Sequence, residues 1–178
     1  MSLCLIATVG RMNPPTCGHE RIIEIVKATA HQCDGTPLIL VTKTHDKKNP
    51  LMLDDKVKHL RRAFPYSGLY TTDSWVKTLE VMSSYYDELL LVCGSDREAH
   101  YERIIAETLR KSWSYASVLP VRRDENDANP MMNISATKMR QFAQACDFDS
   151  FYRHLPTNLK KYEYAKELYE DVKSKLAL

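Results

Sequence analysis

The chain has 178 residues, of which 44% are hydrophobic and 27% charged, and its formal net charge is only +2. This length suits one domain with a sizeable core, at about 100–200 residues per domain, and the composition is that of an ordinary globular protein. Because basic residues are interleaved with acidic ones, the charge distribution argues against a nucleic-acid partner.

Cysteine content and hydropathy exclude two further classes. The cysteines are widely spaced and include no CxxC pair, so they indicate neither a disulfide framework nor a zinc site; they are Cys4, Cys17, Cys33, Cys93 and Cys146. The apolar run at 3–9 is too short for a signal peptide or a membrane span, and no other segment is long enough to cross a bilayer. We therefore expect a reduced, cytoplasmic protein with no membrane partner.

Short apolar runs alternate with helical patterns along the chain, which favours βαβ units and a parallel sheet. In chain order the expected elements are a strand at 3–9, a helix around 20–27, a strand at 38–42, a helix over 53–64, a strand at 69–71, a helix over 76–85, a strand at 88–93, a helix over 101–109 and a strand at 116–120. In the helix over 53–64 we expect Val57, Leu60 and Phe64 to be buried, and Pro65 to end it.

The last third of the chain differs from the alternating part. A polar loop is expected over 121–133, and the pattern from Ser135 is helical with breaks near 146–147 and 156–157. The predicted fold is therefore α/β: a doubly wound, five-stranded parallel sheet of Rossmann-like type with a helical C-terminal extension. We expect a single domain over 1–178, with a core at 1–146, an appendage at 147–178 and a ligand crevice above the first and fourth strands.

Glycine positions indicate where a ligand would lie. Of the five glycines, Gly10 ends the first strand, Gly18 opens the first helix and Gly94 ends the fourth strand, whereas Gly35 and Gly68 look like turn residues. Phosphates bind at the carboxyl ends of such strands and at helix N-termini, where glycine lets backbone N–H groups come close. Ordinary turn formation is the simpler interpretation of any one glycine, but the joint pattern favours a phosphate site.

His19 lies in the first turn of the first predicted helix, directly after Gly18. A lone histidine is more often a surface or core residue, but its neighbours Gly10, Asn13 and Thr16 favour a functional role. A phosphoryl-type transition state is stabilised mainly by positioned donors, so a histidine N–H, a threonine hydroxyl and helix-end amides suit it, and no covalent nucleophile is needed.

Segment 10–19 resembles the T/HxGH signature of the nucleotidyltransferase superfamily, and segment 134–140 resembles its second signature, the ISSTxxR stretch. The opening of the first is similar to that of archaeal-type nicotinamide mononucleotide adenylyltransferases and related phage-encoded proteins, although Met12 replaces the aromatic residue. Asn49-Pro50-Leu51 resembles the family's Asn-Pro-Phe, and Gly94-Ser95-Asp96 its nucleotide-binding turn. The similarity extends along most of the chain.

The resemblance implies roles for these residues. His19 would bind the α-phosphate of a nucleoside triphosphate, with the Thr16 hydroxyl replacing the first histidine of the usual pair, and Arg140 would stabilise the leaving pyrophosphate. Ser135 and Thr137 would bind the β- and γ-phosphates, although a serine before a helix is also an ordinary N-cap. The full set of implied nucleotide-binding residues is Gly10, Arg11, Met12, Asn13, Gly18, Gly94, Ser95, Asp96, Ile134, Ser135 and Thr137.

Acceptor and metal contacts are less marked in the sequence. Lys43 and Lys48 could reach an acceptor phosphate from the 43–49 loop, although loop lysines are usually solvated. Trp75 resembles a position that faces the nicotinamide ring in pyridine-nucleotide adenylyltransferases, or is a core anchor of its helix. The acidic stretch 124–127 lacks EF-hand spacing, the histidines lack zinc spacing, and neither Walker A nor GxGxxG occurs. We expect no metal held by protein side chains, and Mg²⁺ bound through the nucleotide phosphates.

The resemblance implies transfer of AMP from ATP to a small phosphomonoester, with nicotinamide mononucleotide as the leading acceptor, giving NAD and pyrophosphate in the cytoplasm, or in the host cytoplasm if the chain is phage-encoded. Three alternatives stay open: cytidylyl transfer to a phosphorylated alcohol, adenylyl transfer to a pantetheine phosphate, and a nucleotide-binding or phage structural protein without turnover. Tyr162, Tyr164 and Tyr169 are expected to pack on an amphipathic helix face or to form a homo-oligomer contact.

Overall fold

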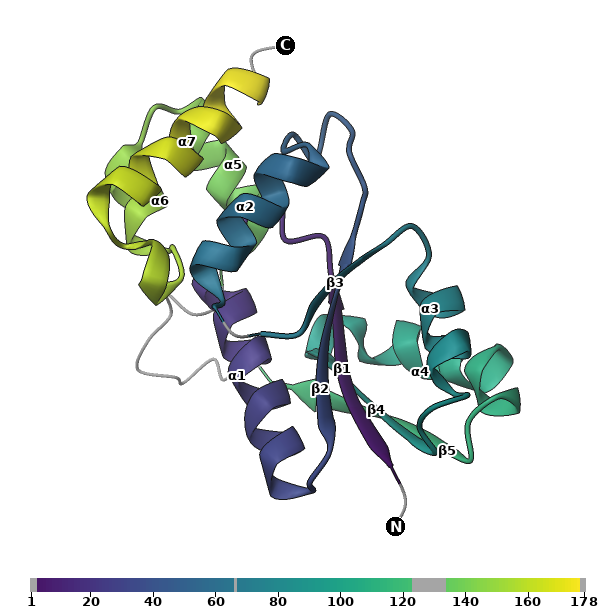
Figure 1. Ribbon diagram of the computed structural model, residues 1–178. Coiled ribbons are helices and arrows are strands. Elements are labelled where there is room, and N and C mark those ends of the chain that lie inside the picture. Colours follow the sequence, from purple (N-terminus) through teal and green to yellow (C-terminus); the bar gives the residue numbers. More distant parts are fainter. Residues whose placement is uncertain (1–2, 66, 123–133, 177–178) are drawn as a thin grey trace. The chain divides into compact units, whose positions relative to one another are not determined.

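The computed structural model describes residues 3–65, 67–122 and 134–176 (Figure 1). The chain forms two compact units, each assembled from three stretches of sequence. The first unit comprises Met1–Gly10, Ile22–Thr42 and Ser67–Asp124, and the second comprises Arg11–Arg21, Lys43–Tyr66 and Glu125–Leu178. The expected single domain with a boundary at 146 stays a prediction.

A five-stranded parallel sheet forms the first unit. Its strands are β1 (Cys4–Gly10), β2 (Thr36–Thr42), β3 (Leu69–Thr72), β4 (Glu88–Gly94) and β5 (Tyr115–Val121), in the order β3-β2-β1-β4-β5. Every strand pair is parallel, which confirms the predicted sheet. The strand order reverses between β1 and β4, and such a switch point is where open α/β sheets bind ligands.

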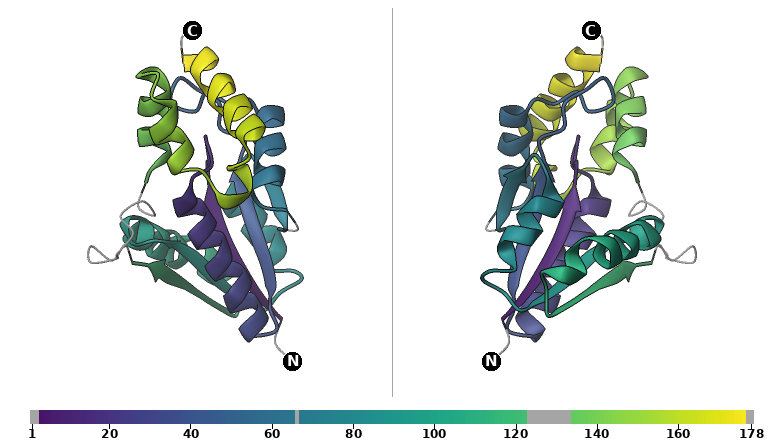
Figure 2. Two further views of the ribbon diagram at one scale, coloured as in Figure 1. Left: turned by 90° about the vertical axis from the view of Figure 1, so that its left-hand side faces the viewer. Right: turned by 90° about the vertical axis from the view of Figure 1, so that its right-hand side faces the viewer.

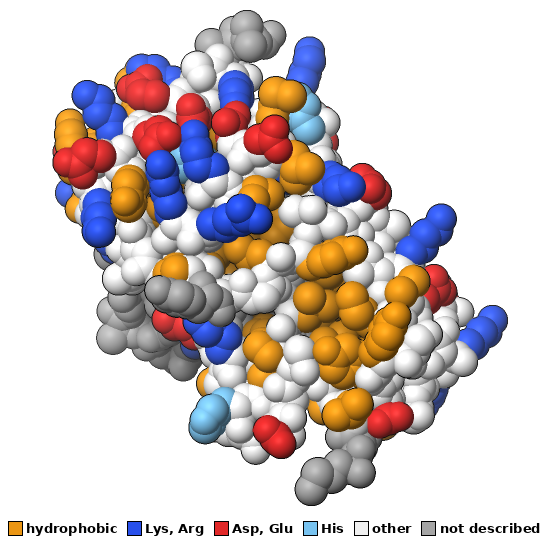
Figure 3. All heavy atoms as spheres, viewed as in Figure 1, with side chains coloured by type: hydrophobic (Ala, Val, Ile, Leu, Met, Phe, Trp, Pro, Cys, Tyr) orange, Lys and Arg blue, Asp and Glu red, His pale blue; other side chains and the backbone are white. Residues whose placement is uncertain are grey.

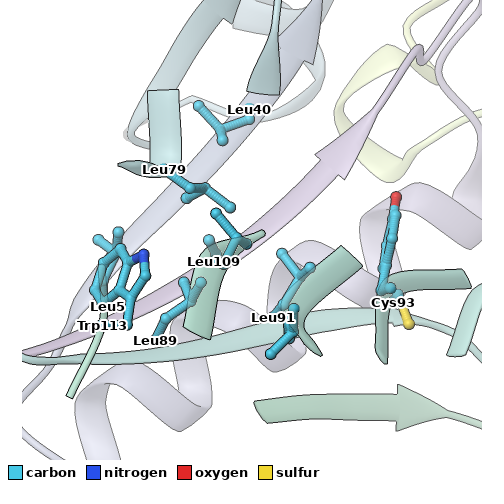
Figure 4. Close-up of a cluster of buried hydrophobic side chains, with 11 residues drawn as sticks. Leu5, Leu40, Leu79, Leu89, Leu91, Cys93, Leu109 and Trp113 are labelled. Carbon is cyan, nitrogen blue, oxygen red and sulfur yellow. The ribbon is translucent and has the colours of Figure 1, made fainter. Parts of the chain in front are cut away.

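Helices cover both faces of this sheet (Figures 1 and 2). On one face, Val26 and Ala30 of α1 (Cys17–Gln32) pack with Ile6 and Val92. On the other, α3 (Trp75–Met82) and α4 (Glu98–Glu107) enclose the larger cluster drawn in Figure 4, which contains Leu5, Ala7, Leu40, Leu79, Leu89, Leu91, Cys93, Tyr101, Ile105, Leu109 and Trp113. The continuous apolar runs of β1 and β4 follow from this arrangement, because consecutive residues face opposite sides of the sheet and both sides are covered.

Two short 3-10 segments complete the first unit: η1 (Ser95–Arg97) precedes α4, and η2 (Leu109–Lys111) follows it. Helix boundaries differ from the expected ones by a few residues, as helix ends often do. α1 is longer than the helix expected around 20–27. α3 ends at Met82, before the expected end at 85, and α4 begins at Glu98, before the expected start at 101. Most of the polar loop expected over 121–133, with the acidic stretch 124–127, lies outside the described residues.

The second unit is helical, and its C-terminal part confirms the predicted extension. It contains α2 (Leu53–Ala63), α5 (Ala136–Gln144), α6 (Phe148–Arg153), the 3-10 segment η4 (Thr157–Leu159) and α7 (Tyr162–Leu176). α7 buries Ala165, Leu168, Tyr169 and Val172. The two expected breaks occur where Cys146 adopts a left-handed conformation (φ 57°) after α5, and where Pro156 precedes η4.

The buried face of α2 differs from the expected one. Leu60 and Phe64 are buried, but Val57 is only partly buried, and the side chains of Lys56 and His59 are fully enclosed. Both side chains have polar partners: Nε2 of His59 lies 2.7 Å from a carboxylate oxygen of Asp171 on α7, and Nζ of Lys56 donates to the Thr44 carbonyl at 3.2 Å. A buried polar group with a partner costs far less than one without.

The ion pairs between α2 and α7 continue along the exposed side. Nζ of Lys58 lies 2.9 Å from Oε1 of Glu167, and Arg62 pairs with the same carboxylate. Lys175 pairs with Asp55. Lys and Arg side chains accordingly alternate with Asp and Glu over these helices (Figure 3). Among the residues described, no helix has both the length and the apolar character needed to cross a membrane.

Candidate active site

The segment between β1 and α1 carries the first signature, and its backbone is unusual at Met12. Met12 has a φ of 45°, the Asn13-Pro14 peptide bond is cis, and the Met12 side chain is 3% exposed. A left-handed conformation at a residue other than glycine costs about 1–2 kcal/mol. Burial of the methionine side chain offsets this cost. Met12 therefore anchors the segment, and its expected contact with a nucleotide stays a prediction.

The side chain of Asn13 is bound at both ends by Leu51. Its Nδ2 donates to the Leu51 carbonyl at 3.0 Å, and its Oδ1 accepts from the Leu51 amide at 3.0 Å. Both bonds are buried, and they connect the first signature to the segment that resembles Asn-Pro-Phe. This pairing gives Asn13 a positioning role, since its amide group is engaged inside the protein.

Thr16 and His19 form a compact hydrogen-bonded pair at the start of α1. The Thr16 amide donates to Nδ1 of His19 at 3.1 Å, and the Thr16 hydroxyl lies 3.0 Å from the same nitrogen. A backbone N–H can only donate, so Nδ1 must be the accepting nitrogen of the ring. In neutral His19 the proton is therefore on Nε2, and the imidazole offers an N–H donor on that side.

The second signature meets the first at Thr16. The Thr16 hydroxyl also lies 3.4 Å from the backbone carbonyl oxygen of Ile134, 118 positions later, and shares its single proton between this oxygen and Nδ1 of His19. Ser135 directly follows Ile134 and is the N-cap of α5, because its hydroxyl accepts from the Lys138 amide at 3.2 Å. The N-cap alternative is thus realised for Ser135, and a phosphate contact by this residue stays a prediction.

Arg140 makes a second connection between the signatures. One guanidinium nitrogen donates to the Asn13 carbonyl at 2.7 Å, and the other terminal nitrogen donates to the Thr137 hydroxyl at 3.0 Å. Burial lowers the pKa of Arg140, and the neighbouring charge of Arg11 lowers it further, whereas Asp46 acts in the opposite direction. Two guanidinium groups near each other are the arrangement that an anion would stabilise.

The 43–49 loop carries Lys43 and Lys48, both exposed. The carboxylate of Asp46 accepts from the Lys48 amide at 2.7 Å and from Nδ2 of Asn49 at 2.9 Å, and these bonds lower its pKa. Nζ of buried Lys56 donates to the Thr44 carbonyl at 3.2 Å, and burial lowers the pKa of Lys56 to about 8. The loop is therefore held by a buried cation on α2, while acceptor binding by its lysines stays a prediction.

Residues near the C-terminus hold the start of α1. The Cys17 amide donates to the His154 carbonyl at 2.9 Å, and the carboxylate of Glu20 accepts from the Thr157 amide at 3.0 and 3.1 Å. Sequence reasoning assigned no role to Glu20, His154, Asp46 or Lys56. A glutamate one residue after the signature histidine was the only local signal, because the other contacts depend on distant chain segments.

The remaining candidates belong to the first unit. Gly10 and Gly94 end β1 and β4, which are neighbours in the sheet. A β-carbon on Gly94 would lie 2.6 Å from a carboxylate oxygen of Asp96, so this side chain folds back over the glycine, and Ser95 is exposed. Trp75 packs against the main core cluster, edge-on to Tyr101 with ring centroids 5.3 Å apart. This is the packing that its alternative role as a core anchor requires.

The donor set of the second unit suits an anion better than a bare cation. Arg11, His19 and Arg140 offer N–H groups, and no cluster of three or more His, Cys, Asp or Glu side chains that could hold a metal ion occurs in the described part of the chain. A metal ion that arrives with bound phosphates fits these residues, because the protein would bind the phosphates. Mg²⁺ stays a prediction.

Comparisons with known proteins identify the family of the chain. The model of the cytidylyltransferase-like family matches residues 7–142, a range that includes both signatures. No curated protein matches the sequence.

Two solved structures with the same fold are named for nicotinate-nucleotide adenylyl transfer. One is provisionally identified as a nicotinate-nucleotide adenylyltransferase from Vibrio parahaemolyticus, with 17% identity, a TM-score of 0.56 and coverage of 93% of this chain and 98% of that one. Another is the Plasmodium falciparum nicotinic acid mononucleotide adenylyltransferase complexed with NaAD, with 14% identity, a TM-score of 0.56 and coverage of 94% and 98%. The archaeal or phage subtype stays a prediction. The family match, the doubly wound sheet and the two joined signatures together show that this chain belongs to the cytidylyltransferase-like family and is a nucleotidyltransferase.

Proposed function

We propose that the protein transfers an adenylyl group from ATP to the phosphate of a pyridine mononucleotide, with nicotinamide mononucleotide as the leading acceptor, NAD as the product and pyrophosphate as the leaving group. The observation that carries this proposal is the set of hydrogen bonds by which Thr16 joins His19 to Ile134 and Arg140 joins Thr137 to Asn13. Support for a pyridine acceptor comes from the two structures of the same fold that are named for nicotinate-nucleotide adenylyl transfer.

The reaction requires in-line attack. An acceptor phosphate oxygen forms a bond to the α-phosphorus of ATP, and the bond from this phosphorus to the bridging oxygen breaks as pyrophosphate leaves. Negative charge increases on the α-phosphate oxygens in the transition state. The Nε2–H of His19 would donate to one of these oxygens, with Nδ1 held by the Thr16 amide 3.1 Å away so that the ring is already oriented.

Arg140 would act on the leaving group. Its two bonds to Asn13 and Thr137 fix the plane of the guanidinium, and Arg11 adds a second positive charge nearby. The backbone amides at the N-terminus of α5 and the hydroxyls of Ser135 and Thr137 would be neutral hydrogen-bond donors for the β- and γ-phosphates. Mg²⁺, when bound through the nucleotide's own phosphates, would neutralise part of the triphosphate charge.

A substrate panel tests the proposal. The protein is incubated with ATP or CTP, Mg²⁺ and one acceptor: nicotinamide mononucleotide, nicotinic acid mononucleotide, phosphocholine or 4′-phosphopantetheine. Pyrophosphate release is measured together with mass spectrometry of the products. We expect NAD from ATP and nicotinamide mononucleotide, and a rate of product formation lower by about 10²–10³ when His19 is replaced by alanine.

Cytidylyl transfer is the second candidate, because the matching family is described as cytidylyltransferase-like. A product that contains CMP would support it and contradict adenylyl transfer. Product from ATP with 4′-phosphopantetheine alone would change the acceptor class. Binding of a nucleotide without pyrophosphate release from any pair would support a non-catalytic protein.

A further inference from the structure

Two cysteines lie in neighbouring segments of the first unit, where β1 begins and α1 has ended. Cys4 is the first residue of β1, and Cys33 directly follows Gln32, the last residue of α1. After α1 the chain turns into β2, with the Gly35 amide donating to the Ala30 carbonyl at 2.8 Å. Leu5 is then paired with Thr36 in the sheet, so the two cysteine-containing segments are neighbours.

Gly35 allows close contact between these segments. A β-carbon on Gly35 would lie 3.0 Å from the Cys4 carbonyl oxygen and 3.1 Å from Sγ of Cys33. Both atoms therefore border the space that a larger residue would fill. Sγ of Cys33 donates to the Ala30 carbonyl at 3.8 Å, and Cys4 packs against the core cluster that contains Ala30, so both cysteines lie beside the end of α1.

The two thiols differ in accessibility. Cys33 is exposed, whereas Cys4 is partly buried. Burial raises the pKa of Cys4 to about 11, so little of this thiol is ionised at neutral pH and its attack on Cys33 would be the slower of the two steps. An oxidant would therefore reach Cys33 first, and Cys4 would then be the adjacent second thiol.

We propose that Cys4 and Cys33 form a reversible disulfide by exchange with a low-molecular-weight disulfide such as glutathione disulfide. The Cys33 thiolate attacks one sulfur of the oxidant, which forms a mixed disulfide and releases one glutathione thiol. Cys4 then loses its proton and attacks Sγ of Cys33, which forms the protein disulfide and releases the second glutathione. Two thiols of the protein are oxidised, and one glutathione disulfide is reduced to two glutathiones.

The disulfide would affect stability more than chemistry. It joins the beginning of β1 to the end of α1, whereas the first signature connects the end of β1 to the beginning of α1. Closing this stretch of chain restricts the unfolded state, so the melting temperature of the oxidised protein should rise. Pyrophosphate release in the substrate panel should stay within twofold of that of the reduced protein, so this test is separate from that of the proposed function.

Peptide mass spectrometry after alkylation tests the disulfide. Full-length protein is incubated with glutathione disulfide, acid-quenched and treated with N-ethylmaleimide. We expect a crosslinked pair of peptides that contain Cys4 and Cys33, lighter by two hydrogen atoms than the two peptides together. The crosslink should disappear with dithiothreitol. Cys146 is also exposed and serves as an internal reference, which should acquire glutathione but no protein crosslink.

Two serine variants separate the steps. In Cys4→Ser, Cys33 should remain as a mixed disulfide with glutathione, because the resolving thiol is missing. In Cys33→Ser, Cys4 should stay reduced under the same conditions. Equal and persistent glutathione labelling of Cys33 in the wild-type protein and in Cys4→Ser, without a crosslinked peptide, would overturn the proposal.

Discussion

A terminal guanidinium nitrogen of Arg140 donates a 2.7 Å hydrogen bond to the backbone carbonyl of Asn13, which is 127 positions earlier in the chain. This bond, with that from Thr16 to Ile134, places the two signature segments beside each other within the second unit. Asn13 is in turn held by Leu51 through both ends of its side-chain amide. The guanidinium of Arg140 is therefore held by the Asn13 carbonyl on one side and by the Thr137 hydroxyl on the other.

Replacing His19 with alanine should lower kcat by a factor of about 10²–10³, as expected when one transition-state donor is removed. The fold should be retained, because Thr16 keeps its bond to the Ile134 carbonyl. Steady-state pyrophosphate release and a urea unfolding curve measure the two effects. His31→Ala, at an exposed position in the last turn of the same helix, is the control and should behave as wild type. An unchanged rate in His19→Ala would remove the histidine from the mechanism.

Replacing Arg140 with alanine should weaken triphosphate binding more than acceptor binding, because the guanidinium would contact the leaving pyrophosphate. Isothermal titration with ATP and, separately, with nicotinamide mononucleotide measures both affinities. Arg103→Ala, at an exposed position on α4, provides the matched loss of one positive charge. Equal weakening of both ligands by Arg140→Ala would contradict the assignment.

Asn13→Ala should lower the free energy of unfolding by about 2–4 kcal/mol, since it leaves the buried amide and carbonyl of Leu51 without their partner. Asn158→Ala removes a single bond, from Nδ2 to the Ala63 carbonyl at 2.9 Å, and should cost about 1 kcal/mol. Urea denaturation measures both values. Equal losses for the two variants would show that the reciprocal pair does not stabilise the segment.

Acid should destabilise the protein partly through Glu167. Hydrogen bonds from Lys58 and Arg62 lower the pKa of this carboxyl from 4.5 to about 2. A carboxyl whose pKa is lower in the folded state contributes stability above its unfolded pKa, and this contribution is lost as the pH falls from about 4.5 to about 2. In Glu167→Gln the melting temperature should depend less on pH over this range than in wild type. In Glu163→Gln, at an exposed site, the pH dependence should be the same as in wild type. Parallel curves for Glu167→Gln and wild type would contradict the pairing.

Raising the pH should stabilise the folded protein through Lys56, because burial lowers the pKa of this residue from 10.5 to about 8. Between these values the unfolded chain binds more protons than the folded one, so this residue's contribution to stability rises with pH. Lys56→Met should be more stable than wild type near pH 7, and the difference should shrink by about 1–3 kcal/mol towards pH 10.5. Urea unfolding over this pH range measures the difference in free energy of unfolding. Lys166→Met, at an exposed site, is the control. A constant difference would indicate that Lys56 titrates normally.

The periodicity of the sequence was sufficient to predict the sheet and the helices between its strands. Apolar runs at β1 and β4 are long because both faces of the sheet are covered, and this is a local pattern in the sequence. The buried face of α2 could not be predicted in this way. His59 is buried because Asp171, 112 positions later, pairs with it, and an apolar pattern contains no information about such a partner.

The candidate site shows the same division. The residues of both signatures are recognisable because glycine, histidine, threonine and arginine occur at characteristic spacings. Their bonds are less predictable. The side chain of Asn13 could donate to a phosphate, but it is hydrogen-bonded to Leu51. The hydroxyl of Thr16, which replaces the first signature histidine, bonds to Ile134. These are long-range contacts, so they depend on the completed fold.

The contacts from His154 and Thr157 to the first turn of α1 bear on any shortened form of the protein. Deleting the polypeptide from residue 154 onward would strip the Cys17 amide and the Glu20 carboxylate of their partners, immediately beside His19. Inactivity of such a truncated protein would then reflect a loosened phosphate-binding turn. It would not be evidence that the tail has an activity of its own.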